Sequence, residues 1–107
     1  MGFGGANMQK MMKQVQKMQV DMAKLQDQLG DMEVEATAGG GVVKITMTGK
    51  QEVRGIEIEP DILTPDDAEM IQDLLTAAFN EALRKSQDLA SEEMAKITGG
   101  LKVPGLF

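Results

Sequence analysis

The residue types that most enzymes use for nucleophilic or acid–base chemistry are largely missing from this chain. Its 107 residues contain no histidine and no cysteine, so a nucleophile of the Ser–His or Cys–His type would lack its base and its thiolate. Carboxylates form the one dense group of ionisable side chains. The densest cluster consists of Glu57, Glu59, Asp61, Asp66, Asp67 and Glu69.

This carboxylate cluster could bind a divalent cation or act as an acid–base pair. Its spacing does not match the EF-hand loop, which needs alternating acids, a glycine and a closing glutamate. Acids at a strand edge and in the first turn of a helix are also favoured without any ligand, because the helix start is electropositive. We therefore predict a protein that is not an enzyme, with no catalytic residue, no metal site and no cofactor.

The triplet Gly39–Gly41 is a second candidate for ligand binding, because glycine-rich loops can cradle phosphates. No Lys-Ser or Lys-Thr pair follows it, and the next segment alternates like a strand. A phosphate-binding loop would instead open a helix. We interpret the triplet as a hairpin turn.

Lysines form a row along the N-terminal segment. The row consists of Lys10, Lys13, Lys17 and Lys24. At ~100° per helical residue these positions fall within about 60° of one another, opposite the apolar positions. The row is either an ordinary solvated face or, if a dimer doubles it, a surface for nucleic-acid phosphates. Three further cations extend the DNA-binding candidates, namely Arg84, Lys85 and Lys96.

Composition narrows the kind of nucleic acid. Aromatic residues make up 3% of the chain, too few for the stacking platforms that bind single strands or RNA, so duplex DNA is the better target. The net charge of -6 is unevenly spread: residues 1–20 carry three lysines and no acid, whereas residues 52–81 carry nine acids and one arginine. DNA is expected to meet the basic ends and avoid the acidic middle.

The periodicity of apolar residues predicts an α+β fold. Apolar residues recur every three or four positions from Met8 to Met32, which predicts a long N-terminal helix over residues 7–29 with Asn7 as its N-cap. Residues 31–58 alternate with period two and predict a three-stranded antiparallel meander. A change of parity in its third strand predicts a bulge at Arg54 and Gly55.

A second long helix is predicted over residues 65–98. Thr64 supplies an N-cap, Pro65 fits the first helical position and acids follow in the first turn. Beyond Arg84 the apolar face thins, so the helix either continues as an extension or breaks near residues 85–90. Residues 99–107 are expected to form a flexible tail.

We expect residues 1–107 to form one domain in the cytoplasm. The length suits a single small core. The N-terminus lacks the apolar segment of a secretory signal, no apolar run approaches the ~18 residues of a membrane span, and cysteine is absent. We predict no membrane partner.

The apolar stripe of the first helix is longer than a small core can cover. A helix over residues 7–29 is about 35 Å long at ~1.5 Å per residue, so part of its stripe needs a partner, which favours a homodimer. Candidate residues for the dimer contact or the core are Met11, Val15, Met18, Met22, Ile45, Met47, Leu75 and Phe79.

Three segments give the chain a family resemblance over nearly its whole length. They are NMQKMMKQVQKMQ near the N-terminus, GGGVVKITMTGKQEVRGIEIEPDIL in the middle, and LLTAAFNEALRKSQ followed by EEMAKITGGL. The chain resembles the YbaB/EbfC family of bacterial nucleoid-associated proteins.

The resemblance implies a tweezer-shaped homodimer that organises the bacterial chromosome and binds DNA in the nucleoid with little sequence specificity. It also implies DNA contacts on projecting parts of the terminal helices, at Lys10, Lys13, Lys17, Arg84, Lys85 and Lys96. The alternative is a protein-interaction adaptor for replication or recombination factors, using the methionine stripe and the acidic middle. An enzyme that uses the carboxylate cluster is a third and weaker hypothesis.

Overall fold

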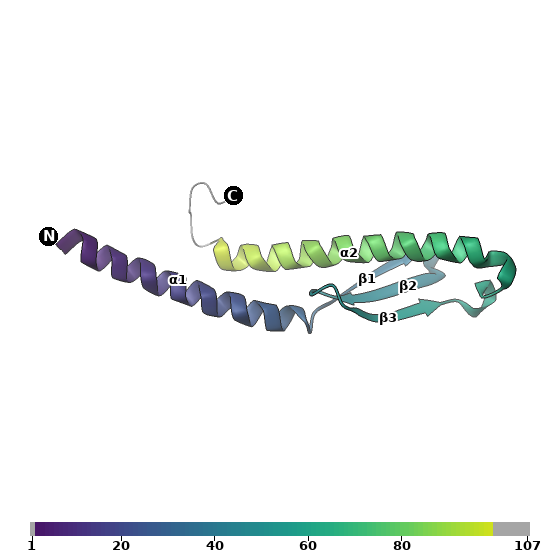
Figure 1. Ribbon diagram of the computed structural model, residues 1–107, viewed down its shortest axis with the longest axis horizontal. Helices are drawn as coiled ribbons and strands as arrows, with labels where there is room; N and C mark the ends of the chain where they lie inside the picture. Colours follow the sequence, from purple (N-terminus) through teal and green to yellow (C-terminus); the bar gives the residue numbers. More distant parts are fainter. Residues whose placement is uncertain (1, 100–107) are drawn as a thin grey trace.

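A helix, a three-stranded sheet and a second helix follow one another along the chain (Figure 1). The computed structural model describes the backbone of residues 2–99 and the side chains of residues 8–99. The elements are α1 (Gly2–Leu29), β1 (Glu33–Ala38), β2 (Val43–Thr48), β3 (Val53–Ile58) and α2 (Ala68–Thr98). The predicted α+β fold is confirmed.

The three strands form an antiparallel meander in the order β1-β2-β3. Thr46 pairs with Gly55 while Met47 pairs with Val53, so Arg54 is the extra residue of a β-bulge at the predicted position. Because of this bulge, Val53 lies on the same face of the sheet as Ile56 and Ile58, although its position in the sequence has the opposite parity.

The glycine triplet turns the chain between β1 and β2, as interpreted from the sequence. Gly39–Gly41 forms one 3-10 turn, and its three φ angles are +64°, +73° and +99°. Side chains other than glycine rarely adopt these angles. A Cβ atom on Gly39 would also lie 2.7 Å from Val42 Cγ2, so position 39 has no room for a larger residue.

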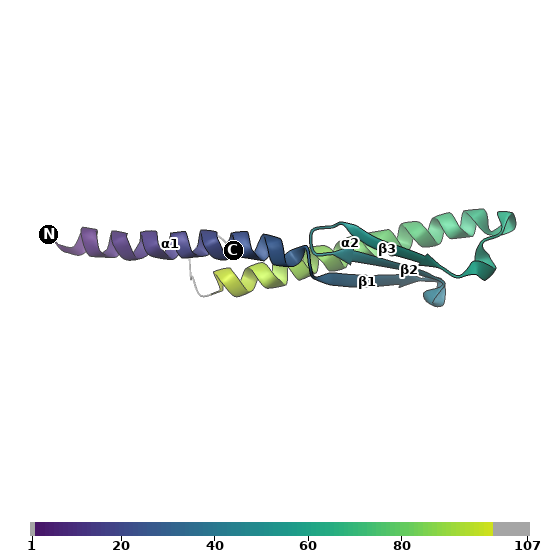
Figure 2. The same ribbon diagram turned by 90° about the horizontal axis from the view of Figure 1, so that it is seen from below.

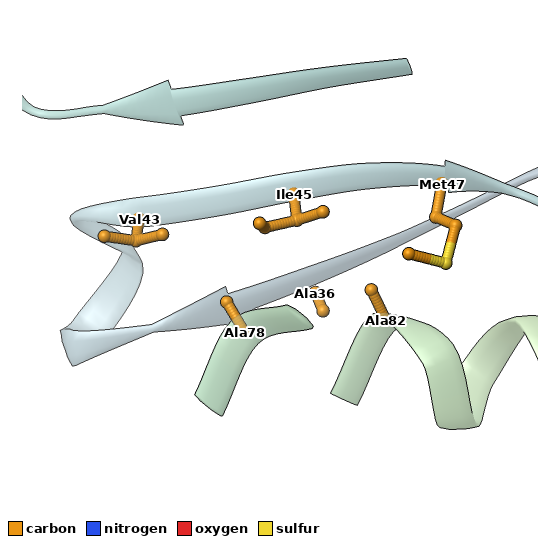
Figure 3. Packing of buried hydrophobic residues seen from close by; sticks show 6 residues of the cluster. All are labelled: Ala36, Val43, Ile45, Met47, Ala78 and Ala82. Carbon is orange, nitrogen blue, oxygen red and sulfur yellow. The ribbon is translucent and has the colours of Figure 1, made fainter. Parts of the chain in front are cut away.

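The core lies between α2 and one face of the sheet. Its fully buried members are Ala36, Val43, Ile45, Met47, Ala78 and Ala82 (Figure 3). The two alanines of α2 let the helix approach the strands closely, while Leu75 and Phe79 pack at the margin of the same cluster. Contacts from α2 fall mainly on β1 and β2, so the helix lies off-centre and leaves β3 less covered.

Helix α2 is continuous from Ala68 to Thr98, which excludes the break near residues 85–90. The apolar face thins there because Ser86 takes the place of an apolar residue. Its side chain is fully buried, and its Oγ donates a hydrogen bond of 2.8 Å to the Thr48 carbonyl. A buried polar residue with a partner interrupts the pattern of the sequence without interrupting the helix.

Both helix starts differ from the prediction. Residues Pro65–Asp67 form a 3-10 turn, so α2 begins at Ala68, and the Thr64 hydroxyl donates to the Asp67 carboxylate at 2.9 Å instead of capping the backbone. Helix α1 begins at Gly2, five residues before the predicted N-cap Asn7. The expected flexible tail lies outside the described residues, apart from Gly99.

The molecule is elongated, with extents of 78 × 24 × 15 Å. Helix α2 runs back along the sheet and then beside the C-terminal part of α1, and the N-terminal part of α1 extends past it (Figures 1 and 2). Between residues 2 and 99, neither helix combines the length and the apolar character that would cross a bilayer.

Candidate nucleic-acid interface

The N-terminal part of α1 projects as a single helix from the rest of the molecule (Figure 1). We call residues 2–20 the arm. Where side chains are described, from residue 8 onward, the arm carries three lysines and no acid. The structure thereby separates the most basic segment of the chain from the acidic sheet.

The lysine row predicted from the sequence lies on one exposed face of α1. Lys10, Lys13, Lys17 and Lys24 are all exposed, and within residues 8–99 none of them forms an ion pair. The apolar side chains Met11 and Val15 lie on the other side of the helix, also exposed, whereas Met18 and Met22 are half-buried near the end of α2. The arm is therefore amphipathic, with a lysine face and a methionine face.

Contacts at the base of α1 fix the direction of the arm. Leu25 and Leu29 are buried. The Gly49 N–H donates to the Leu29 carbonyl at 2.9 Å and to the Met32 carbonyl at 3.0 Å, and Arg54 Nη2 donates to the Gly30 carbonyl at 2.8 Å. The carbonyl groups at the end of the helix, which a helix leaves without partners, are thus bound by the turn after β2 and by the bulge of β3.

The cations of α2 that were candidates for DNA contact already have partners. Arg84 pairs with Glu81 and, at 3.3 Å, with Asp88. Its hydrogen bond to Glu81 lowers the pKa of that carboxyl and raises the pKa of the guanidinium.

The two lysines of α2 are bound as well. Lys85 Nζ donates to the Glu35 carbonyl at 2.8 Å, and Lys96 Nζ lies 3.0 Å from the Glu93 carboxylate. Contact of these cations with a phosphate requires an exchange of partners, which the arm lysines do not need.

The face of the sheet opposite α2 is acidic and carries one cross-strand ion network. Lys44 on β2 lies 3.0 Å from the Glu57 carboxylate and 3.7 Å from the Glu35 carboxylate. The hydrogen bond to Glu57 and the charge of Glu35 raise the pKa of Lys44. Among the described residues, no three His, Cys, Asp or Glu side chains lie close enough together to hold a metal ion.

One surface was not singled out by the sequence. Val53 and Ile56 of β3 point to the covered face of the sheet but remain 45% and 47% exposed, because α2 lies over β1 and β2. The alternation showed that β3 has an apolar face. It could not show which strand the helix leaves uncovered.

Comparisons with known proteins agree with this architecture. The chain is 59% identical to a nucleoid-associated protein of Pelotomaculum thermopropionicum over 103 residues, covering 96% of this chain and 98% of that protein. It is 62% identical to a nucleoid-associated protein of Desulforamulus reducens, with the same coverage.

A solved structure shares the fold. The crystal structure of the uncharacterized protein HP0035 from Helicobacter pylori superposes with a TM-score of 0.63 at 22% identity, covering 73% of this chain and 90% of that one. Residues 3–101 match the sequence model of the YbaB/EbfC DNA-binding family. On this match and on the close relatives, the chain belongs to the YbaB/EbfC DNA-binding family.

Proposed function

We propose that this protein binds duplex DNA in the bacterial nucleoid as a homodimer, with little sequence preference and through the lysine face of the arm. The observation that carries the proposal is the row of four exposed lysines on α1 without ion pairs in residues 8–99, three of them on the projecting arm. The close relatives named nucleoid-associated proteins support the location, and the match to the YbaB/EbfC DNA-binding family supports the ligand.

Low sequence specificity follows from the chemistry of the contacts. Lysine ammonium groups bind phosphate oxygens as point charges, and phosphate contacts carry no direct sequence information. The acidic open face of the sheet repels DNA, so the backbone is expected to lie along the arm. The three cations of α2 add less, since each must first leave a carboxylate or carbonyl partner.

The homodimer is supported by the uncovered apolar flank of β3. Lys85 marks the side of α2 that faces β1, because it bonds to Glu35. Phe79 and Leu83 are half-buried and lie roughly 120–160° around the helix from Lys85, on the side of β3. Together with Val53 and Ile56 they form the β3 flank, an apolar strip that a second copy would cover.

The proposal predicts that charge on the arm matters more than charge elsewhere. K13Q/K17Q removes two arm lysines, and K44Q/K50Q makes the same change in net charge on the sheet and its turn. We expect the arm variant to bind a duplex of random sequence far more weakly. Its slope of log affinity against log salt is expected to fall by about 1.8 per arm, at about 0.9 per lost phosphate contact. Fluorescence anisotropy across a salt series measures both.

Two results would contradict this function. Equal DNA affinities of the arm and sheet variants would show that the arm is not the contact surface. A salt slope near zero for the wild-type protein would show that it does not bind the phosphates. Retention of replication or recombination proteins from a nuclease-treated lysate, with no DNA binding, would instead favour the adaptor hypothesis.

A further inference from the structure

The methionine face of the arm forms an open apolar groove that the proposed DNA contact does not use. One groove of about 410 Å³ is lined by Met8, Met11, Met12 and Val15, with Gln16 and Gln19 at its side. The three methionines are 59–63% exposed. An exposed apolar surface of this kind on a projecting helix indicates that another segment or molecule binds there.

A second groove joins the first one to the end of α2. It has a volume of about 470 Å³, shares Val15 and Gln19 with the first groove, and is lined by Thr98 as well. Thr98 is the last residue of α2. The chain therefore leaves α2 beside two adjoining apolar grooves along α1.

The direction of α2 and the length of the chain after it allow residues 101–107 to lie in these grooves. Helix α2 approaches the arm antiparallel to α1, so its C-terminal end points toward the N-terminus of α1 (Figures 1 and 2). The stretch from Val15 to Met8 rises about 10 Å along the helix, whereas the seven residues 101–107 span up to about 23 Å when extended. They can cover the methionines without full extension.

The chemistry of these residues fits the groove. Four of the seven are apolar, namely Leu101, Val103, Leu106 and Phe107, and the segment contains no acid. Phe107 is one of only three phenylalanines in the chain. Methionine side chains adapt to irregular partners and make favourable contacts with aromatic rings.

We propose that residues 101–107 dock into the methionine groove of the same chain and cover Met8, Met11 and Met12. A second copy of the arm is the competing occupant. The tail is favoured because it is tethered at Thr98, which lines the second groove, so its effective concentration is in the millimolar range of short linkers. The dimer contact proposed at the β3 flank lies over the sheet, so it does not by itself bring the partner's arm to this groove.

The absence of cysteine allows a direct test. A nitroxide on G105C in the full chain, with isotope-labelled methionine methyl groups, is expected to remove most of the signal of Met8, Met11 and Met12 while leaving Met47 and Met70 unchanged. A nitroxide on T37C, on the exposed face of β1, is the matched control and should spare the arm. Adding L106S/F107S to the G105C chain keeps the tether and removes the apolar contacts.

Each outcome decides the proposal. Loss of the arm signals with G105C, and their recovery in the L106S/F107S background, would support docking. No loss, or a loss that persists in that background, would overturn it, since proximity would then come from the tether alone. A mixture of isotope-labelled chains without nitroxide and spin-labelled chains without isotope tests the source: loss of the arm signals in this mixture would mean that a second copy's tail fills the groove, which also overturns the proposal.

Discussion

Gly49 illustrates how a single residue connects α1 to the sheet. Its N–H is shared between the carbonyls of Leu29 and Met32, and a Cβ atom at this position would lie 2.9 Å from the Leu29 carbonyl oxygen and 2.8 Å from its Cδ2. A backbone atom cannot move aside as the end of a flexible side chain can. The close approach of the turn to the base of α1 therefore depends on glycine.

We predict that G49A destabilises the fold, because its Cβ atom would overlap the Leu29 carbonyl oxygen. Overpacking of this kind costs about 1–3 kcal/mol of unfolding free energy, which urea denaturation followed by circular dichroism would measure. G55A is the matched control, because no atom lies within 4 Å of a Cβ built on Gly55. A loss for G55A as large as for G49A would refute the steric explanation.

Sequence spacing predicted the arm lysines but not the state of the other cations. A shared helical face follows from periodicity alone, so the spacing of Lys10, Lys13 and Lys17 is enough to group them. The partner of Lys85 is a carbonyl 50 positions away in the chain. Such contacts depend on how α2 packs against β1, which no local pattern encodes.

For the strands, the alternation of apolar residues predicted the arrangement correctly. For the helices, the capping signals did not predict where each helix begins. The strand order and the bulge at Arg54 follow from period-two patterns and parity. The start of α1 at Gly2 was missed because Asn7 is a good N-cap that the helix passes through. The break considered in α2 came from the thinning of the apolar face beyond Arg84, where the polar residue Ser86 is in fact buried and bonded to the Thr48 carbonyl.

The middle of α2 carries an ion pair with a predictable pH dependence. Arg84 lowers the pKa of Glu81 below its ordinary value of 4.5, so the pair stabilises the fold above that value and its contribution is lost as the pH falls through the lower value of the folded state. E81Q is expected to reduce the melting temperature slightly near pH 7. The difference from wild type should vanish toward the acid end of a pH series.

The size of this effect is limited because the pair is solvent-exposed. E92Q removes an exposed acid of the same helix that forms no ion pair among the described residues. This control should leave the melting temperature unchanged at both ends of the series. A pH-independent deficit for E81Q would mean that Glu81 contributes by packing and not by charge.

Two features of the molecule bear on how it assembles: its elongated shape and the incomplete covering of the sheet by α2. One helix cannot cover three strands, so the off-centre position of α2 leaves the β3 flank exposed. The same chain extends to 78 Å because the arm leaves the core. A dimer through the β3 flank would hide the apolar strip and leave both lysine faces free for one duplex.

This arrangement predicts that I56E uncouples dimerisation from folding. A buried carboxylate at the contact is costly, so we expect a monomer by sedimentation equilibrium with an unchanged circular dichroism spectrum, since Ile56 is 47% exposed within one chain. DNA affinity should fall by about 10²-fold, because two linked arms bind with the advantage of effective concentration. T37E places the same charge on the exposed side of β1 and should remain dimeric.

Two outcomes would contradict this arrangement. A dimeric I56E would show that the dimer interface does not lie at the β3 flank. A monomeric I56E that bound DNA as tightly as T37E would show that one arm suffices, and the two-armed contact would have to be abandoned.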